Sequence, residues 1–435
     1  MRICASLSSY EESGSASEAD MIEIRLDLLD KIPETDRELL VTFRGDVDLS
    51  VLPEGYDGMI DIGENEIPET DLRTISSFHD YESTPSSDNI SDILERMGGD
   101  IRKGAFMVRT FSDLHNIFTA ASSMKTEHVI LGMGEMGTVT RIRQQLLGNA
   151  FTFGYVGAPT APGQLSVDRM RELGDDCTIL GIIGNPLMKS QSPTMQNAAL
   201  ESAGINGMYL KFDCEDTEHV CDVIREYDIR GVNVTIPHKQ NIIQQMDTMD
   251  HNADAVGAVN TVVNTNGILK GYNTDLVGIE TAMMNADFKP NGRRAVIMGS
   301  GGAARACAYT LTGRGCHVTI TGRNTAKASG LAKEMGCEFR PKESVSVGMY
   351  DLIVNCTPVG MYDTGEYPLK LEHLNRGQTV FDMVYGYETP LITKARVAGA
   401  GIISGADMLA GQGAASFGLW TGDQNQYSIM RKVLE

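Results

Sequence analysis

The sequence lacks the features of several protein classes. None of its eight cysteines forms a CxxC pair or stands with histidine at zinc-ligand spacing. No apolar run approaches the roughly 20 residues that cross a bilayer. The N-terminal segment also has no long apolar stretch of the kind found in a secretory signal. We therefore expect no disulfide, no structural metal, no membrane contact and a location in the cytoplasm.

Basic residues are scarce as well. The chain has 37 Lys and Arg against 58 Asp and Glu, which gives a formal net charge of −21. This charge argues against nucleic acid or an anionic membrane as the main partner. No long acidic block occurs, so we interpret the excess charge as a solubility feature. Small molecules are the expected partners, and an anionic one must be bound by a local cluster of Arg or Lys. The oligomeric state stays open, with a homodimer as one option.

The 435 residues exceed the size of one hydrophobic core, so two or three folded units are expected. In the first ~170 residues, short β-rich runs alternate with polar or helical stretches. The eight runs are 3–7, 21–29, 39–43, 58–63, 74–78, 104–109, 128–133 and 151–156. This alternation predicts parallel strands, and eight of them favour a small (β/α)8 barrel of the TIM type. An open doubly wound sheet is the alternative. The segment is short for a barrel, and the gaps at 44–58 and 63–74 leave room only for stub helices.

Three arginines follow strand-like runs in this half: Arg25, Arg44 and Arg141. Functional groups of a TIM barrel gather at the carboxyl ends of its strands. Arginines that converge there would form an anion site, because a guanidinium matches a carboxylate in geometry. An arginine of this kind, taken alone, is more often part of a surface ion pair.

Lys103 lies at the entrance of the sixth run and is a candidate Schiff-base nucleophile if it points into the barrel mouth. His79 follows the fifth run and is a candidate general acid and base, since imidazole titrates near neutrality. A solvated lysine and a structural histidine are the alternatives.

This half resembles the type I 3-dehydroquinate dehydratases. The matching pieces, in the family's order, are EIRLD, VTFR, SFHDYESTP, GGDIRKGAFM, GTVTRI and APTAPGQL. The resemblance implies that Lys103 forms an imine with the substrate ketone, while His79 removes the proton next to that carbon and then protonates the departing hydroxyl. It also implies that Arg141 binds the substrate carboxylate. The full set of substrate-binding residues implied by the resemblance is Ser6, Glu23, Arg25, Arg44, Arg141, Thr160 and Gln164.

A second α/β pattern begins near residue 178, and it contains a Gly-rich turn between a strand and a helix. Gly299, Gly301 and Ala304 follow the run AVIM and open a helical stretch. Glycines at this spacing let backbone N–H groups approach a pyrophosphate at the helix N-terminus. About twenty residues later the chain offers no acid for a ribose hydroxyl but carries Arg323, which can pair with a 2′-phosphate. We therefore expect NADP(H) rather than NAD.

Lys239 and Asp275 form a candidate proton-transfer pair. A ketone reductase must protonate the alkoxide that forms as hydride arrives, and a lysine beside an aspartate can supply that proton. Ser190 and Ser192 present two hydroxyls along an extended segment, which suits a carboxylate or a polyol. The alternative for Ser192 is a helix N-cap before Pro193.

Residues 178–435 resemble the shikimate dehydrogenases throughout. The matching pieces are GNPLMKSQSPTMQNA, GVNVTIPHK, GAVNTV, GYNTD, GSGGAARA, NCTPVGM, FDMVYGYETPL and MLAGQGAASFGLW. The resemblance makes Lys239 and Asp275 the catalytic pair. It implies that the substrate is bound by Ser190, Ser192, Thr235, Asn260, Tyr385 and Gln412. It implies that the cofactor is bound by Gly299, Ser300, Gly301, Gly302, Ala303, Gly322, Arg323, Asn324, Thr357, Met383 and Gly405.

The sequence therefore predicts two fused enzymes of one pathway. We expect a dehydratase barrel at 1–172, a substrate-binding α/β domain at 178–276 completed by a C-terminal helix at 412–435, and a Rossmann domain at 277–411. The first enzyme would convert 3-dehydroquinate to 3-dehydroshikimate, and the second would reduce that ketone to shikimate. One alternative is a quinate/shikimate dehydrogenase that uses NAD. The other is a non-catalytic ligand sensor built on the same folds.

Overall fold

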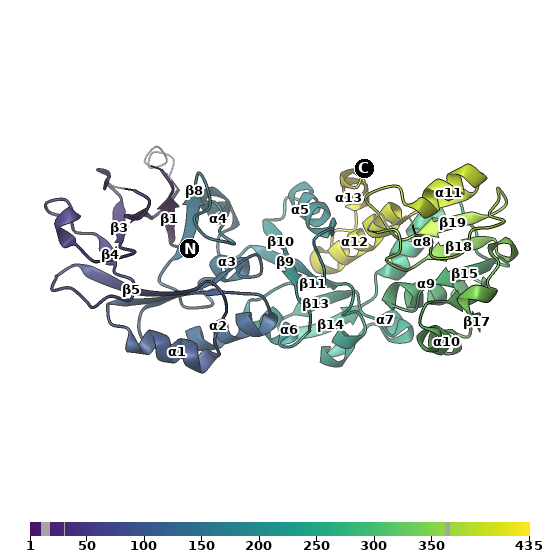
Figure 1. Cartoon of the computed structure of the whole chain (residues 1–435), viewed down its shortest axis with the longest axis horizontal. Coiled ribbons are helices and arrows are strands. Elements are labelled where there is room, and N and C mark those ends of the chain that lie inside the picture. The colour runs from purple at the N-terminus through teal and green to yellow at the C-terminus, as the bar shows by residue number, and fades with distance from the viewer. Residues whose placement is uncertain (10–17, 30, 362–365) are drawn as a thin grey trace. The chain divides into compact units, whose positions relative to one another are not determined.

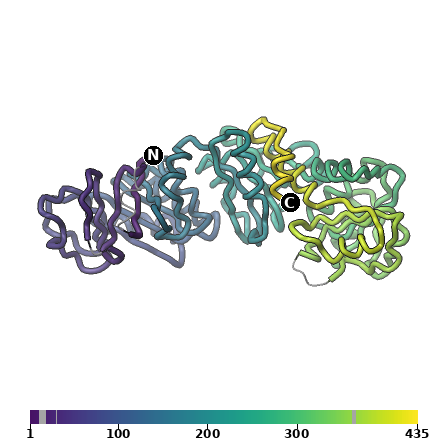
Figure 2. Tube along the Cα trace, turned by 90° about the horizontal axis from the view of Figure 1, so that it is seen from above, coloured from purple at the N-terminus to yellow at the C-terminus, as the bar shows by residue number. Residues whose placement is uncertain are grey.

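A computed structural model describes residues 1–9, 18–29, 31–361 and 366–435. The chain divides into two compact units, and both are discontinuous in sequence. The first consists of Met1–Gly181 and Asn206–Ile229, and the second of Ile182–Ile205 and Arg230–Glu435. Figure 2 follows the chain by colour from one end to the other.

The first unit contains an eight-stranded parallel sheet that curls into a nearly closed barrel. Its strand order is β7-β6-β5-β4-β3-β2-β1-β8, and neighbouring strands in this order are parallel. The strands are β1 (Ile3–Leu7), β2 (Met21–Arg25), β3 (Glu38–Thr42), β4 (Met59–Asp61), β5 (Arg73–Asp80), β6 (Ile101–Met107), β7 (His128–Met133) and β8 (Thr152–Val156). The expectation of a small TIM barrel is confirmed, and each of the eight runs overlaps a strand (Figure 1).

Buried side chains from all the strands, or from the residue just before a strand, meet in one hydrophobic cluster. Its members are Cys4, Met21, Leu40, Met59, Ile75, Ile101, Val129, Leu131, Phe151 and Phe153. Alternate residues of a strand point to one face, so these side chains fill the interior of the barrel. The residues further along each strand therefore lie at the carboxyl-terminal mouth of the barrel.

Few helices surround this barrel, which explains its short sequence. They are α1 (Ser87–Arg96), α2 (Phe111–Ser123), α3 (Thr138–Ile142) and α4 (Val167–Leu173). The gap at 44–58 holds only the 3-10 helix η2 (Leu49–Val51), and the gap at 63–74 holds no helix. Helix α2 begins at a capping box, in which the side chains of Thr110 and Asp113 each accept a hydrogen bond from the other residue's backbone N–H.

The segment 206–229 of the first unit adds β10 (Gly207–Asp213) and α6 (Val220–Glu226). Several contacts hold this segment against α2. The hydroxyl of Tyr227 donates to the carbonyl of Leu114 at 2.9 Å, and the rings of Phe111 and Phe212 lie 5.3 Å apart. Tyr227 and Phe212 are fully buried, so the segment belongs to the hydrophobic core of this unit.

A second, mixed sheet has the order β10-β9-β11-β13-β14-β12. Its further strands are β9 (Thr178–Gly184), β11 (Gly231–Val234), β12 (Thr248–Met249), β13 (Thr261–Thr265) and β14 (Ile268–Tyr272). The associated helices are α5 (Ser192–Ser202), η3 (Asn241–Gln245), α7 (His251–Val256) and α8 (Asp275–Asn285).

A third sheet is wholly parallel, with the order β17-β16-β15-β18-β19-β20. The strands are β15 (Arg294–Met298), β16 (His317–Thr321), β17 (Glu338–Phe339), β18 (Leu352–Asn355), β19 (Thr379–Asp382) and β20 (Gly401–Ser404). The connecting helices are α9 (Gly302–Gly313), α10 (Thr325–Glu334), η4 (Lys342–Ser344), η5 (Val347–Met349) and α11 (Pro390–Ala398). This doubly wound sheet confirms the expected Rossmann-like architecture, whose ligands bind at the carboxyl ends of the strands.

The single C-terminal helix expected at 412–435 is two helices, α12 (Gly405–Thr421) and α13 (Tyr427–Val433). Gly422 separates them because it takes a left-handed conformation with φ of 84°, which ends α12. Helix α12 packs along α8, and α13 packs on α5 (Figure 1). The indole of Trp420 is buried and donates to the carbonyl of Val262 at 2.9 Å.

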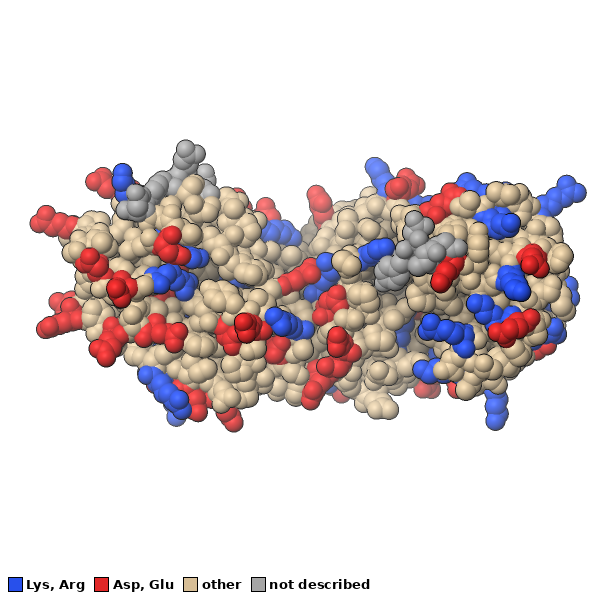
Figure 3. All heavy atoms as spheres, in the orientation of Figure 1, with Lys and Arg blue, Asp and Glu red and all other residues tan. Residues whose placement is uncertain are grey.

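No helix in the described ranges is both long enough and apolar enough to cross a bilayer. Figure 3 shows the acidic side chains scattered over the visible face rather than gathered in one block. This distribution agrees with the absence of a long acidic run in the sequence.

Candidate active sites

The nine residues predicted for the first site line one cavity of the barrel. They are Ser6, Glu23, Arg25, Arg44, His79, Lys103, Arg141, Thr160 and Gln164. Two of them differ in position from the expectation. Lys103 is the third residue of β6 rather than a residue at its entrance, and Arg141 belongs to α3 rather than to a segment directly after a strand.

Lys103 points into the barrel and is almost fully buried, with 5% of its side chain exposed. Its Nζ donates to Oδ2 of Asp61 at 3.0 Å and lies 4.0 Å from Oε1 of Glu23. The ammonium also lies 4.2 Å from the ring centroid of Phe153. The amine is therefore fixed in one position by two carboxylates and an aromatic face.

Asp61 is a site residue that the sequence reasoning missed. It ends β4, two residues after Met59 of the barrel interior, so the period of two along a strand indicates its direction. Its Oδ1 accepts from the hydroxyl of Ser77 at 2.6 Å and from the N–H of Gly63 at 3.0 Å. Burial raises the pKa of Asp61, but the charge of Lys103 and these hydrogen bonds outweigh it and hold the pKa below its usual value.

Arg44 lies against His79 in the mouth of the barrel. Its two terminal nitrogens are 3.2 and 3.3 Å from the two ring nitrogens of His79. Burial, together with the charges of Lys103 and Arg44, lowers the pKa of His79 to about 3. The imidazole is therefore neutral at neutral pH and has a lone pair that can accept a proton.

The three arginines of the site have different partners. Arg25 forms a double hydrogen bond with Asp27, at 3.1 and 2.6 Å, so its charge is already neutralised. Arg141 is buried, makes a 3.3 Å bond to the carbonyl of Phe153 and has an Nε without a hydrogen-bond acceptor. Burial lowers the pKa of Arg141 to about 10. Within the described part of the chain no carboxylate pairs with Arg141, which makes it the best-placed cation for an incoming anion.

Thr160 and Gln164 belong to one loop, which closes on itself. Oε1 of Gln164 accepts from the N–H of Thr160 at 2.8 Å, from its hydroxyl at 3.1 Å and from the N–H of Ala161 at 3.0 Å. Gly163 has φ of 75°, and a Cβ there would lie 2.1 Å from the carbonyl oxygen of Gly134. Only glycine fits this approach, which holds the loop beside the cavity.

The predicted second pair is in contact. Nζ of Lys239 donates to Oδ2 of Asp275 at 2.6 Å, and the side chain of Asp275 is 4% exposed. The other carboxylate oxygen, Oδ1, accepts from Nδ2 of Asn260 at 2.9 Å. Asp275 is also the first residue of α8, where the helix dipole stabilises a negative charge. The carboxylate is therefore fixed, and it holds the lysine in place.

The predicted substrate residues of this site come from several elements of the second unit. The hydroxyl of Tyr385 is hydrogen-bonded to Ser190, and burial nevertheless raises the pKa of Tyr385. Gln412 of α12 accepts from Asn260 at 3.4 Å. Thr235 follows β11, and its methyl group approaches Gly184 so closely that a Cβ on that glycine would lie 2.4 Å away. The N-cap expected at Ser192 lies one residue earlier, at Gln191, and Ser192 is the first residue of α5.

The Gly-rich turn runs from β15 into α9, as predicted. Gly299 has φ of 126°, which favours glycine, and a Cβ at Gly301 would meet no atom within 4 Å. A Cβ at Gly302 would lie 2.9 Å from Cδ of Lys239, so the turn passes directly beside the predicted catalytic lysine. The first turn of α9 carries no acidic residue and no side-chain cap. This open helix N-terminus fits a pyrophosphate.

Arg323 is exposed at the end of β16, and Asn324 caps α10 by accepting from the N–H of Lys327 at 3.0 Å. No carboxylate among the described residues forms an ion pair with Arg323, so its charge is available to a 2′-phosphate. The remaining predicted cofactor residues, Thr357, Met383 and Gly405, follow β18, β19 and β20 directly or within two residues. They lie at the carboxyl-terminal edge where a dinucleotide binds in this fold.

Three family models match the chain. Residues 46–175 match type I 3-dehydroquinase, residues 182–262 match the shikimate dehydrogenase substrate binding domain, and residues 405–435 match the shikimate 5′-dehydrogenase C-terminal domain.

Curated relatives cover the second part of the chain. A shikimate dehydrogenase (NADP(+)) of Moorella thermoacetica is 40% identical over 271 residues, which are 59% of this chain and 92% of that protein. One from Methanococcus maripaludis is 38% identical over 59% of this chain and 96% of the relative.

Solved structures cover the same part. A shikimate dehydrogenase in complex with NADP+ has a TM-score of 0.57 at 36% identity, over 59% of this chain and 94% of its own. The Thermus thermophilus enzyme in complex with NADP(H) and shikimate has a TM-score of 0.54 at 34% identity, over 59% and 100%. A quinate dehydrogenase from Corynebacterium glutamicum in complex with NAD has a TM-score of 0.55 at 28% identity, over 59% and 98%.

Proposed function

Because the chain belongs to the shikimate dehydrogenase family and its first part is a type I 3-dehydroquinase domain, we propose that its two residue clusters catalyse consecutive steps on one carbon skeleton. The chain is a bifunctional enzyme of the shikimate pathway, a lyase and an NADP-dependent oxidoreductase. The product of the dehydratase, 3-dehydroshikimate, is the ketone that the dehydrogenase reduces. The observation that carries the assignment is the presence of both complete clusters, one in each unit.

In the proposed dehydration, Nζ of Lys103 attacks the ketone carbon of 3-dehydroquinate. The carbonyl oxygen leaves as water and an imine forms. His79, neutral because its pKa is low, takes the proton from the adjacent carbon, and the imine accepts the electron pair. His79 then gives its proton to the departing hydroxyl, and water releases the product from Lys103. Arg141 binds the substrate carboxylate, with Ser6, Glu23, Arg25, Arg44, Thr160 and Gln164 as further substrate-binding residues.

Asp61 has a positioning role in this proposal. Its ion pair with Lys103 holds the amine in place, and an ammonium must lose one proton before it attacks the ketone. His79 lies in the same cavity and can relay that proton to the carbonyl oxygen that leaves as water.

In the proposed reduction, Lys239 gives a proton to the carbonyl oxygen of 3-dehydroshikimate, while Asp275 holds the lysine and is held in turn by Asn260. Bound NADPH supplies the hydride. The hydroxyls of Ser190, Ser192, Thr235 and Tyr385 and the amide of Gln412 bind the substrate. Gly299, Ser300, Gly301, Gly302 and Ala303 accommodate the pyrophosphate at the start of α9, and Gly322, Arg323 and Asn324 accommodate the 2′-phosphate. Thr357, Met383 and Gly405 complete the cofactor site.

We retain the predicted division into a barrel at 1–172, a substrate domain at 178–276 with the C-terminal helices, and a cofactor domain at 277–411. The location in the cytoplasm and the assembly as a homodimer also stay predictions. Quinate with NAD is the alternative substrate pair, since a quinate dehydrogenase in complex with NAD is among the similar structures. The free charge of Arg323 favours NADP(H) over NAD.

Trapping of the imine tests the first half of this proposal. Borohydride added with 3-dehydroquinate reduces an imine to a stable amine, so mass spectrometry should find the adduct on Lys103 and no turnover afterwards. The variant Lys211→Ala is a matched control, because Lys211 is a partly exposed lysine of the same unit that pairs with Glu135. It should be trapped like the wild type. An active enzyme without any adduct on Lys103 would refute the imine step.

A further inference from the structure

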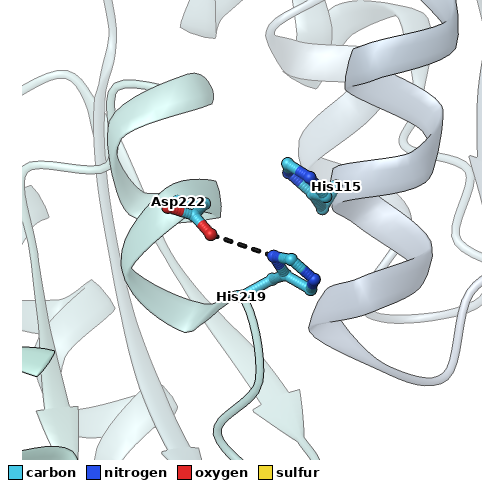
Figure 4. A group of neighbouring side chains, drawn as sticks. All are labelled: His115, His219 and Asp222. Carbon is cyan, nitrogen blue, oxygen red and sulfur yellow. Dashed lines mark hydrogen bonds and ion pairs between the residues drawn. The ribbon is translucent and has the colours of Figure 1, made fainter.

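A cluster of two histidines and two carboxylates lies between α2 and α6, apart from both catalytic sites and within the first unit. Figure 4 shows three of its members, His115, His219 and Asp222. His115 comes from α2, while His219 and Asp222 come from the start of α6 and Glu226 from its last residue. One possible ligand atom from each of His115, His219 and Asp222 lies within 4.8 Å of the other two. None of these residues takes part in the two proposed reactions.

The hydrogen bonds of the two imidazoles favour metal binding. Nδ1 of His115 is 2.7 Å from Oε1 of Glu226, and Nδ1 of His219 is 2.9 Å from Oδ2 of Asp222. In His219, an ion in place of the proton shared with Asp222 would contact both groups. In His115, the carboxylate on Nδ1 places the ring proton there and leaves the lone pair on Nε2. Metal-binding histidines usually have this second carboxylate contact, which fixes the ring and raises its basicity.

The two rings lie face to face, 4.1 Å apart and inclined by only 7°. Each ring also lies beside a carboxylate, that of Glu226 or that of Asp222. Arg225 is a nearby cation, but its guanidinium is 4.0 Å from Asp222.

Glu226 provides an independent indication. Its Oε2 is buried and has no hydrogen-bond partner, so only one of its two oxygens is satisfied. A buried carboxylate oxygen without a partner is costly, and a cation bound to His115 would offset part of that cost.

We propose that His115, His219 and Asp222 bind one zinc ion, and that Glu226 positions His115 for it. Imidazole nitrogen and carboxylate oxygen are ordinary zinc ligands, and water completes a tetrahedral shell. Zn–N distances of about 2.0–2.1 Å imply ligand atoms roughly 3.3 Å apart, so the side chains must move inward by about 1–1.5 Å. The side chains of His115, His219 and Asp222 are 28, 34 and 51% exposed, which leaves them room for this movement.

The ion would fasten segment 206–229 to the barrel, because its ligands come from both sides of the contact between α2 and α6. This proposal departs from the sequence-based expectation that the chain has no structural metal. The two histidines are far apart in the sequence, so no spacing pattern reveals them.

The test is a titration of the untagged, full-length chain with zinc after treatment with a chelator, followed by calorimetry. The wild type should bind one equivalent. His115→Ala and His219→Ala should each weaken binding by more than tenfold, and Glu226→Gln by about 10- to 100-fold. His251→Ala is the matched control, since His251 is an exposed histidine of the second unit, and it should bind zinc like the wild type.

Dehydratase and dehydrogenase activities report whether each variant is folded, because the cluster lies outside both sites. Cobalt provides a second readout: it should give visible absorption bands in the wild type that are absent in His219→Ala. If the folded His115→Ala and His219→Ala variants bind zinc as tightly as the wild type, the proposal is wrong. The cluster would then consist only of the pairs His115–Glu226 and His219–Asp222.

Discussion

Lys103 and Lys239 both lie beside a buried carboxylate, but their surroundings suit different chemistry. Lys103 is 5% exposed, faces an aromatic ring and shares its cavity with a neutral histidine. Lys239 is 14% exposed and lies next to the Gly-rich turn. In the proposed reactions the first lysine forms a covalent bond, whereas the second only transfers a proton. Asp61 and Asp275 fix each amine at the place where it acts.

The low pKa of His79 predicts an unusual pH profile for the dehydratase. Burial and the cations Lys103 and Arg44 disfavour the imidazolium, so the neutral base persists down to about pH 3 instead of being lost near pH 6.5. On the acid side, kcat/KM for 3-dehydroquinate should therefore show no pKa between 6 and 7 in the free enzyme. Arg44→Ala removes one of the two cations and should move the acid limb upward. A wild-type limb centred near pH 6.5 would contradict this assignment of His79.

Arg323 predicts the choice of cofactor. Arg323→Ala removes a charge-assisted contact to the 2′-phosphate, worth about 1.5–3 kcal/mol, so KM for NADPH should rise roughly 10- to 100-fold. KM for NADH should not change, because NADH lacks that phosphate. Lys333→Ala, an exposed cation at the other end of α10, is the control and should leave both constants unchanged. An equal rise in both Michaelis constants would show that Arg323 does not bind the 2′-phosphate of NADPH.

At the scale of the elements, helix α9 offers a matched pair of glycines. A methyl group at Gly302 would contact the side chain of Lys239, whereas one at Gly313 would meet no atom within 4 Å. Gly302→Ala should displace the lysine and lower the dehydrogenase kcat by roughly 10- to 100-fold, since a shift of about 1 Å can cost that much. Gly313→Ala should leave the rate unchanged and alter stability by less than about 1 kcal/mol. Steady-state rates of both variants decide the matter, and equal rates would refute the close approach.

The elements were predictable from the sequence where one local signal decides them. The barrel strands are recognisable as short apolar runs, and the turn before α9 is recognisable by the spacing of its glycines. Both were therefore predicted correctly. The break in the C-terminal helix was not predicted, because it depends on one left-handed residue, Gly422, inside an otherwise continuous helical pattern. Asp61 was missed because its role arises only when β4 and β6 stand on opposite sides of β5. The histidine cluster likewise exists only in three dimensions.

At the scale of the whole molecule, each unit contains every residue proposed for its own reaction. The dehydratase residues all fall within Met1–Gly181, and the dehydrogenase residues fall within Ile182–Ile205 and Arg230–Glu435. A variant in one site should therefore leave the other reaction intact. The two halves of the enzyme are linked by chemistry, since one site makes what the other consumes.

Oxidation of NADPH with 3-dehydroquinate as the only carbon substrate tests the central claim most directly. The wild type should oxidise NADPH under these conditions. Lys103→Ala should do so only when 3-dehydroshikimate is supplied, and Asp275→Asn should form 3-dehydroshikimate but oxidise NADPH at a rate lower by about 10²–10⁴-fold. A mixture of the two variants should restore the full conversion. Failure of the wild type to oxidise NADPH from 3-dehydroquinate, or of the mixture to do so, would contradict the assignment of one reaction to each unit.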